Sequence, residues 1–120
     1  MSGSILDKKF KTIRVQEKDD VIVVELVDKK INCPVRIELL GEEFCELYEV
    51  RKFVLDMTGV TFLSTPATNR LILLNKRILV EKLRVCNLEE SIKGMFLETF
   101  LDQMFAVFDT LKQAIKSFEE

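Results

Sequence analysis

The sequence contains no histidine and no tryptophan, and it has few of the residues that build tight backbone turns, with four glycines and two prolines in 120 residues. The missing histidine removes the commonest general base, the usual activator of serine and cysteine nucleophiles, and the ligand of most catalytic zinc sites. A carboxylate or lysine enzyme would remain open, but the chain also lacks a glycine-rich phosphate loop. We therefore predict a protein that is not an enzyme and that uses neither a cofactor nor a metal.

Cysteine is scarce and dispersed, since Cys33, Cys45 and Cys86 are far apart in the sequence and form no CxxC pair. This spacing argues against a disulfide framework and against a zinc site. Cys45 and Cys86 lie within apolar patterns, so we expect both to fill the core. Free thiols of this kind are typical of a reducing compartment, which predicts a cytoplasmic protein.

Charge of one sign is not concentrated anywhere, because the formal net charge is −2 and lysines and arginines are mixed with acids. Nucleic acid binding requires a concentrated positive surface, so that function is not predicted. No apolar run approaches the roughly 20 residues that span a membrane, and the N-terminus lacks the apolar stretch of a signal peptide. We expect no membrane insertion.

What the sequence does contain is an apolar fraction of 48%, which is typical of a globular protein. The length fits one domain, so we predict a single domain over residues 1–120, in which residues 1–8 are an N-terminal segment that could be disordered. The first half of this domain is expected to form two strands, at residues 10–16 and 21–27, joined as a hairpin by a turn at Lys18–Asp20.

A loop at residues 28–33 then leads into a helix that has Pro34 in its first turn, where the missing proline N–H costs little. The apolar residues of this helix recur at helical spacing: Ile37, Leu40, Phe44 and Leu47. Residues 53–57 form a short apolar run that predicts a central strand buried on both faces.

The second helix has a strong predicted start, with Thr65 as the capping residue and Pro66 in the first helical position. Its inward face is expected to hold Ala67, Leu71, Leu74 and Ile78, widened by Leu73 and Val80. A strand is predicted at residues 83–88, a helix from Glu89, a short strand at 105–108, and a last helix capped by Asp109 or Thr110. The third helix is expected to turn Ile92, Met95, Phe96 and Thr99 to one side.

The predicted fold is therefore α/β, with element order ββαβαβα(β)α and a mixed sheet of four to five strands covered by about four helices. In such sheets, ligands and partners bind at the carboxyl ends of the strands, next to the N-termini of the following helices. Two segments lie there: the loop Asp28–Cys33 and the turn Ser64–Pro66.

Several segments of the sequence resemble the STAS (anti-sigma factor antagonist) family. Residues 53–67 are similar to the central segment of these domains, and Leu83–Leu88 is similar to their next strand. Leu101-Asp102-x-x-Phe105 resembles the segment before the family's last strand, and Asp109-Thr110-Leu111-x-x-Ala114 resembles the start of its last helix. The resemblance covers most of residues 20–118, and its strength lies in the order and spacing of the pieces.

The resemblance implies a regulatory domain that binds a kinase-type anti-sigma factor and is switched off by serine phosphorylation at the start of the second helix. At that site the family's Asp-Ser-Ser-Gly becomes Ser64-Thr65-Pro66-Ala67, and we align the phosphoacceptor serine with Pro66, which has no hydroxyl. Thr65 and Ser64 are then the candidate replacement phosphoacceptors, although both residue types are also ordinary at helix starts. The expected partner-binding residues are Asp28, Asn32, Asp56, Ser64, Thr65, Pro66, Ala67 and Asn69.

Two alternatives remain at this point. The chain could be a STAS-type accessory subunit of a membrane transport complex, or an enzyme that uses Asp56 with Ser64 or Thr65. An enzyme would require a closed polar pocket at the Ser64 turn, whereas a binding module would present an open, convex surface. The sequence does not identify the partner and leaves open whether the chain forms a homodimer.

Overall fold

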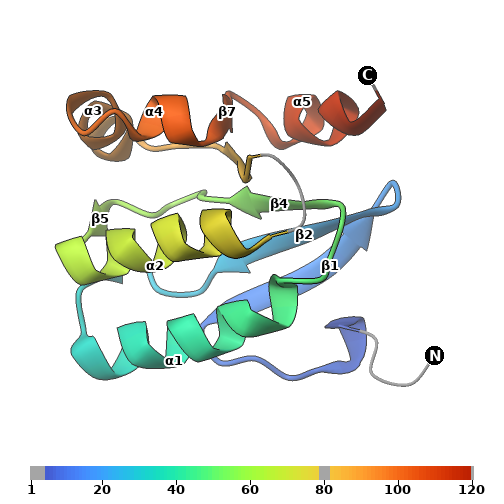
Figure 1. Ribbon diagram of the computed structural model, residues 1–120, viewed down its shortest axis with the longest axis horizontal. Coiled ribbons are helices and arrows are strands. Elements are labelled where there is room, and N and C mark those ends of the chain that lie inside the picture. Colours follow the sequence, from blue (N-terminus) through green and yellow to red (C-terminus); the bar gives the residue numbers. More distant parts are fainter. Residues whose placement is uncertain (1–4, 79–81, 120) are drawn as a thin grey trace.

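The computed structural model describes residues 5–78 and 82–119, and these form an α/β fold around a mixed sheet (Figure 1). Within these residues the main sheet has five strands in the order β1-β2-β4-β6-β7. The strands are β1 (Ile13–Lys18), β2 (Val21–Leu26), β4 (Phe53–Asp56), β6 (Arg84–Cys86) and β7 (Ala106–Phe108). Only β1 and β2 pair antiparallel, and the three pairings that follow are parallel, as the predicted helical crossovers require.

The helices lie on both faces of this sheet, in the alternating order that the sequence predicts. They are α1 (Pro34–Phe44), α2 (Thr65–Arg77), α3 (Glu90–Glu98), the short α4 (Leu101–Met104) and α5 (Leu111–Lys116). Three short 3-10 helices occupy Ile5–Asp7, Cys45–Leu47 and Ser117–Glu119. The predicted α/β class and the mixed sheet are confirmed.

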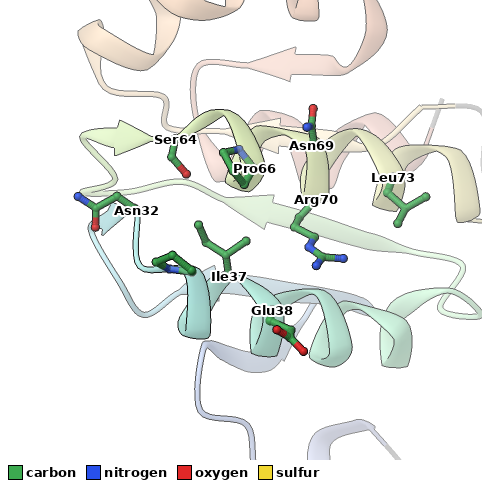
Figure 2. Close-up of a pocket in the computed structure, with 9 residues that line it drawn as sticks. Asn32, Ile37, Glu38, Ser64, Pro66, Asn69, Arg70 and Leu73 are labelled. Carbon is green, nitrogen blue, oxygen red and sulfur yellow. The ribbon is translucent and has the colours of Figure 1, made fainter.

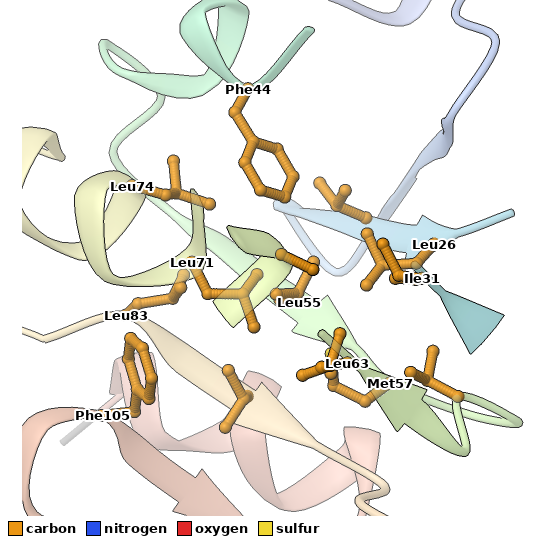
Figure 3. Close-up of a cluster of buried hydrophobic side chains, with 14 of the residues drawn as sticks. Leu26, Ile31, Phe44, Leu55, Met57, Leu63, Leu71, Leu74, Leu83 and Phe105 are labelled. Carbon is orange, nitrogen blue, oxygen red and sulfur yellow. The ribbon is translucent and has the colours of Figure 1, made fainter. Parts of the chain in front are cut away.

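Two hydrophobic cores share the sheet. The larger one packs α1 to α4 against one face (Figure 3), and its sheet residues include Val24, Leu55 and Val85. The smaller one packs α5 against the other face through Ala114 and Ile115. Because every second residue of a strand points to the opposite face, β4 serves both cores and is fully buried.

A second, two-stranded sheet was not predicted. It pairs β3 (Lys30–Ile31) with β5 (Phe62–Leu63) in parallel, and lies directly before the starts of α1 and α2. Two residues per strand leave too short a pattern for any sequence period to show. The pairing ties the two candidate partner-binding segments to each other.

Several predicted core positions are wrong. Leu73 is 38% exposed, because it lies at the edge of the inward stripe of α2, and Cys45 is exposed at the end of α1. Thr99, which the spacing placed on the same side as Ile92 and Phe96, is the C-cap of α3 and is exposed, with its hydroxyl donating to the Met95 carbonyl oxygen, whereas Ile92 and Phe96 are buried. Val80 lies outside the described residues.

The last helix begins as the sequence predicts. The Thr110 hydroxyl accepts a hydrogen bond from the Gln113 N–H at 3.1 Å, and the Gln113 side chain accepts one from the Asp109 N–H at 3.2 Å. This reciprocal arrangement satisfies N–H groups that a helix start would otherwise leave without partners.

Candidate functional site

The first turn of α2 begins one residue earlier than predicted. Ser64, and not Thr65, is the capping residue: its hydroxyl accepts from the Ala67 N–H at 3.3 Å. Thr65 is thereby the first helical residue, and Pro66 is the second. The prediction failed by one position because serine and threonine both cap helices, with serine the better of the two, and proline is accepted in the first turn.

This difference separates the two candidate phosphoacceptors. The Ser64 hydroxyl holds the helix start, and the Ser64 carbonyl oxygen also accepts from the Thr68 N–H and hydroxyl. Thr65 is exposed, and its hydroxyl makes no hydrogen bond within the part of the chain that the structure describes. Thr65 is therefore the hydroxyl that a second protein can reach.

An open groove of about 540 Å³ runs between α1 and α2 beside this turn (Figure 2). Four of the predicted partner-binding residues line it, namely Asn32, Ser64, Pro66 and Asn69. The other lining residues are Pro34, Ile37, Glu38, Arg70 and Leu73. The surface is neither the closed polar pocket expected of an enzyme nor the convex surface expected of a binding module.

Gly41 allows Arg70 to lie across the space between the two helices. A Cβ atom at Gly41 would lie 2.9 Å from the guanidinium carbon of Arg70, which is too close for a real contact. The glycine therefore makes room for a side chain, and not for another backbone. Figure 2 shows Arg70 directed from α2 toward α1, with Glu38 on the facing helix.

Sequence reasoning missed Arg70 and Glu38, because each is an ordinary charged residue on the polar side of an amphipathic helix. The one available signal was Gly41 in the middle of a helix, where glycine is unfavourable unless something approaches closely.

Asp28 does not line the groove, because Arg36 binds it. The guanidinium of Arg36 donates to both carboxylate oxygens of Asp28, at 2.9 and 3.0 Å, and to the Lys11 carbonyl oxygen at 3.0 Å. The hydrogen bonds that Arg36 donates to Asp28 are the main reason that the pKa of Arg36 is raised above its ordinary value. Asp28 thus fixes the loop before α1, while its side chain stays 31% exposed.

Asp56 is buried at the carboxyl end of β4 and has a structural set of partners. Its carboxylate accepts from the Thr58 N–H at 3.0 Å, the Thr58 hydroxyl at 2.6 Å and the Asn87 side-chain amide at 3.1 Å. These bonds hold the turn after β4, where Gly59 has a φ of +80° and packs against the Lys29 side chain. Asp56 is 7% exposed, so it has little surface to offer a partner.

The remaining predicted partner-binding residue is buried, whereas two residues that were not predicted are exposed. Ala67 is fully buried in the larger core and has no exposed surface for a partner. Two apolar side chains that the sequence did not single out are exposed beside the starts of α1 and α2: Val35 is 75% exposed and Phe62 is 47% exposed. The accessible face consists of the groove, Thr65, Val35 and Phe62, which we call the α1–α2 face.

The described residues contain no helix that is long and apolar enough to cross a membrane. Among the same residues, no group of three or more histidine, cysteine, aspartate or glutamate side chains is arranged to hold a metal ion.

Comparisons with known proteins agree with this architecture. The STAS domain family model matches residues 11–114. An anti-sigma factor antagonist (STAS) domain protein from Planctomyces limnophilus has a similar fold, with a TM-score of 0.73 and 19% identity, over 88% of this chain and 95% of that one. An anti-sigma factor antagonist from Mycobacterium paratuberculosis gives a TM-score of 0.75 and 20% identity over 91% and 94%. A search of the curated proteins finds no match. The chain belongs to the STAS domain family.

Proposed function

We propose that this chain is a regulatory protein-binding module of the anti-sigma factor antagonist kind, and that it binds a kinase-type anti-sigma factor through the α1–α2 face. The observation that carries the proposal is the position of Thr65: an exposed hydroxyl with no hydrogen-bond partner among residues 5–78 and 82–119, in the first turn of α2 and beside an open groove. The family and the names of the two similar structures support the general kind of function.

The α1–α2 face has the composition of a protein-binding surface. Exposed apolar side chains, Val35 and Phe62, lie near polar groups that can orient a partner, such as Asn32, Asn69 and Arg70. Interfaces are commonly built from apolar anchors surrounded by hydrogen-bonding groups. An arginine that already lies in the groove costs little further entropy when it pairs with a partner carboxylate.

Thr65 is the proposed phosphoacceptor of this module. Phosphorylation would add a charge of about −2 near pH 7 in the middle of the binding face. Ser64 already satisfies the Ala67 N–H, and Pro66 has no N–H, so the helix start has few donors left to bind the phosphate internally. The phosphate would therefore project toward the partner and weaken the complex.

The test begins with capture of partners from the cells that produce the protein, followed by intact-mass spectrometry and binding measurements with the purified partner. We expect a protein with a nucleotide-binding kinase fold. Thr65→Val should bind it and accept no phosphate, whereas Thr65→Glu should bind about tenfold or more weakly. Arg70→Ala should weaken binding without changing phosphorylation chemistry at Thr65.

Two results would decide against the proposal. A phosphate that persists in Thr65→Val and disappears in Ser64→Ala would move the acceptor to Ser64. Capture of transporter subunits in place of a kinase-type protein would favour the transport-accessory alternative, and Arg70→Ala would then test whether the same face is used.

A further inference from the structure

The two edges of the main sheet differ in chemistry. The β1 edge carries exposed polar and charged side chains, among them Arg14, Glu17 and Lys18. The β7 edge reads Ala106-Val107-Phe108 and has neither a charge nor a proline. Folded proteins commonly protect the exposed edge of a sheet with charged residues or proline, because an unprotected edge strand pairs with strands of other chains. Only the β1 edge of this sheet is protected in that way.

The backbone of β7 has hydrogen-bonding groups that face away from the sheet. The Ala106 N–H donates to the Leu83 carbonyl oxygen at 2.9 Å, toward β6. In a parallel ladder the next residue directs its N–H and C=O to the opposite side, so those of Val107 point outward. The register aligns Val107 with Val85, which places its side chain on the face of the larger core.

On that face an apolar patch borders the edge strand. Val107 and Leu97 line one groove and are 37% and 63% exposed, and Phe100, which follows α3, is 68% exposed; we call these three residues the edge patch. A small groove of about 160 Å³ lies beneath it, lined by Leu88, Lys93, Phe96, Leu97, Asp102 and Val107. Figure 1 shows α3, α4 and β7 following one another along one margin of the molecule.

Phe100 lies in a conformation that a bulky residue rarely adopts. Its φ is 62° and its ψ is 19°, in the left-handed region where glycine is favoured. Its side chain gains little from the core in return, since most of it is exposed. The left-handed backbone ends α3, as is common at helix C-termini, and it leaves an exposed aromatic ring that a second chain could cover.

We propose that the β7 edge and the edge patch bind a second copy of this chain. Two copies related by a two-fold axis would pair their β7 strands antiparallel around Val107 and continue the five-stranded sheet across the dimer. The edge patches of both copies then lie on one face and cover each other. The α1–α2 face lies on other elements and remains accessible.

Charge complementarity favours a second copy over an unrelated partner. Lys93 and Asp102 line the same groove, yet neither makes an ion pair within the described residues. A two-fold axis at Val107 that passes between Lys93 and Asp102 would present the cation of each copy to the anion of the other, so the patch would be complementary to itself. The same rim would give an unrelated partner no preferred sign of charge.

The first test measures molar mass by sedimentation equilibrium of the full chain. We expect twice the 13.9 kDa of one chain. Val107→Pro removes the outward N–H and the valine side chain of the edge patch, and should preserve the fold because an edge strand tolerates proline where its N–H faces away from the sheet. Phe100→Gly removes the aromatic ring and places glycine in a left-handed conformation that is unfavourable for phenylalanine. Val107→Pro and Phe100→Gly should each weaken dimerisation about tenfold or more. Phe100→Gly should also raise the midpoint of denaturation when it is measured at a concentration where the protein is monomeric. Val35→Ser, an exposed apolar change on α1, is the control and should leave the dimer intact.

The second test uses the charges. Lys93→Glu and Asp102→Lys should each weaken the homodimer, because each places like charges together. An equal mixture of the two variants should form a heterodimer more readily than either variant dimerises alone. A single-chain mass up to millimolar concentration would overturn the proposal. So would a dimer that resists Val107→Pro and Phe100→Gly, or a mixture of charge variants with no preference for the heterodimer.

Discussion

At the scale of single residues, two adjacent hydroxyls at the start of α2 have different tasks. The Ser64 hydroxyl caps the helix, and the Thr65 hydroxyl is exposed and has no hydrogen-bond partner among the residues that the structure describes. A capping hydroxyl must stay in place for the helix to begin, whereas a modified hydroxyl must be reachable. The separation lets the surface change chemically while the fold beneath it is unchanged.

We expect Ser64→Ala to lower the free energy of unfolding by about 1 kcal/mol, the usual cost of losing a capping side chain. Thr65→Ala should change it by less than about 0.5 kcal/mol, because no internal hydrogen bond is lost. Urea denaturation followed by circular dichroism measures both values. Equal losses for the two variants would mean that Thr65 shares the cap.

The three cysteine thiols differ in burial and therefore in expected reactivity. Burial, and after it the charge of Asp56, raises the pKa of Cys86 to about 12, so its reactive thiolate form is nearly absent at neutral pH. Cys33 and Cys45 are exposed. Iodoacetamide at neutral pH should therefore alkylate Cys33 and Cys45 in the native protein and Cys86 only after denaturation, which peptide mass spectrometry detects. Rapid native alkylation of Cys86 would contradict its burial.

At the scale of elements, hydrophobic spacing predicts the structure well where a segment is long. Ile37, Leu40 and Phe44 on α1, and Ala67, Leu71 and Leu74 on α2, are buried as their spacing predicts. The spacing cannot locate the edge of a buried stripe, so Leu73 was wrongly included. The two-residue strands β3 and β5 leave no periodic signal at all.

The candidate site was predictable only in its location. The rule that partners bind at the carboxyl ends of strands identified the turn before α2 and the loop before α1. It could not say that Arg36 binds Asp28 or that Asp56 is buried, because these depend on distant segments meeting in the fold. Arg70 was missed for the same reason, since its place in the groove depends on a glycine of the other helix.

Glu43 connects α1 to the segment before β1. Its carboxylate accepts hydrogen bonds from the N–H groups of Lys11 and Thr12, at 2.8 and 2.7 Å, and from the Thr12 hydroxyl. Partial burial raises its pKa, but these bonds and the charge of Arg36 outweigh burial, so the pKa lies below 4.5. A lowered carboxylate pKa stabilises the fold above the unfolded value, and this contribution disappears as the pH falls through the folded value.

Glu43→Gln should therefore lower the free energy of unfolding by about 1 kcal/mol near neutral pH. The difference from the wild type should shrink as the pH falls below 4.5. Urea denaturation at a series of pH values measures this, with the exposed neighbour Glu42→Gln as the matched control. A difference that stays constant down to strongly acidic pH would show that the charge of Glu43 does not contribute.

At the scale of the whole molecule, one sheet divides two cores of unequal size. The larger core includes Leu71 of α2, and the smaller one holds α5 through Ala114 and Ile115. Both cores use residues of β4, with Leu55 on one side and Val54 on the other. Because both cores stabilise the same sheet, the sheet should not remain folded when either core is lost. We therefore expect the two cores to unfold together.

We expect Ile115→Ala and Leu71→Ala each to lower the free energy of unfolding by roughly 2–4 kcal/mol, because both side chains are buried and each change leaves a cavity. Each variant should still unfold in a single transition with an unchanged denaturant slope. Fluorescence of the single tyrosine, Tyr48, reports on the side of the larger core, while circular dichroism reports on all helices. If the two signals separate in Ile115→Ala but coincide in Leu71→Ala, then α5 detaches before the rest of the sheet unfolds, and the smaller core is an independent unit.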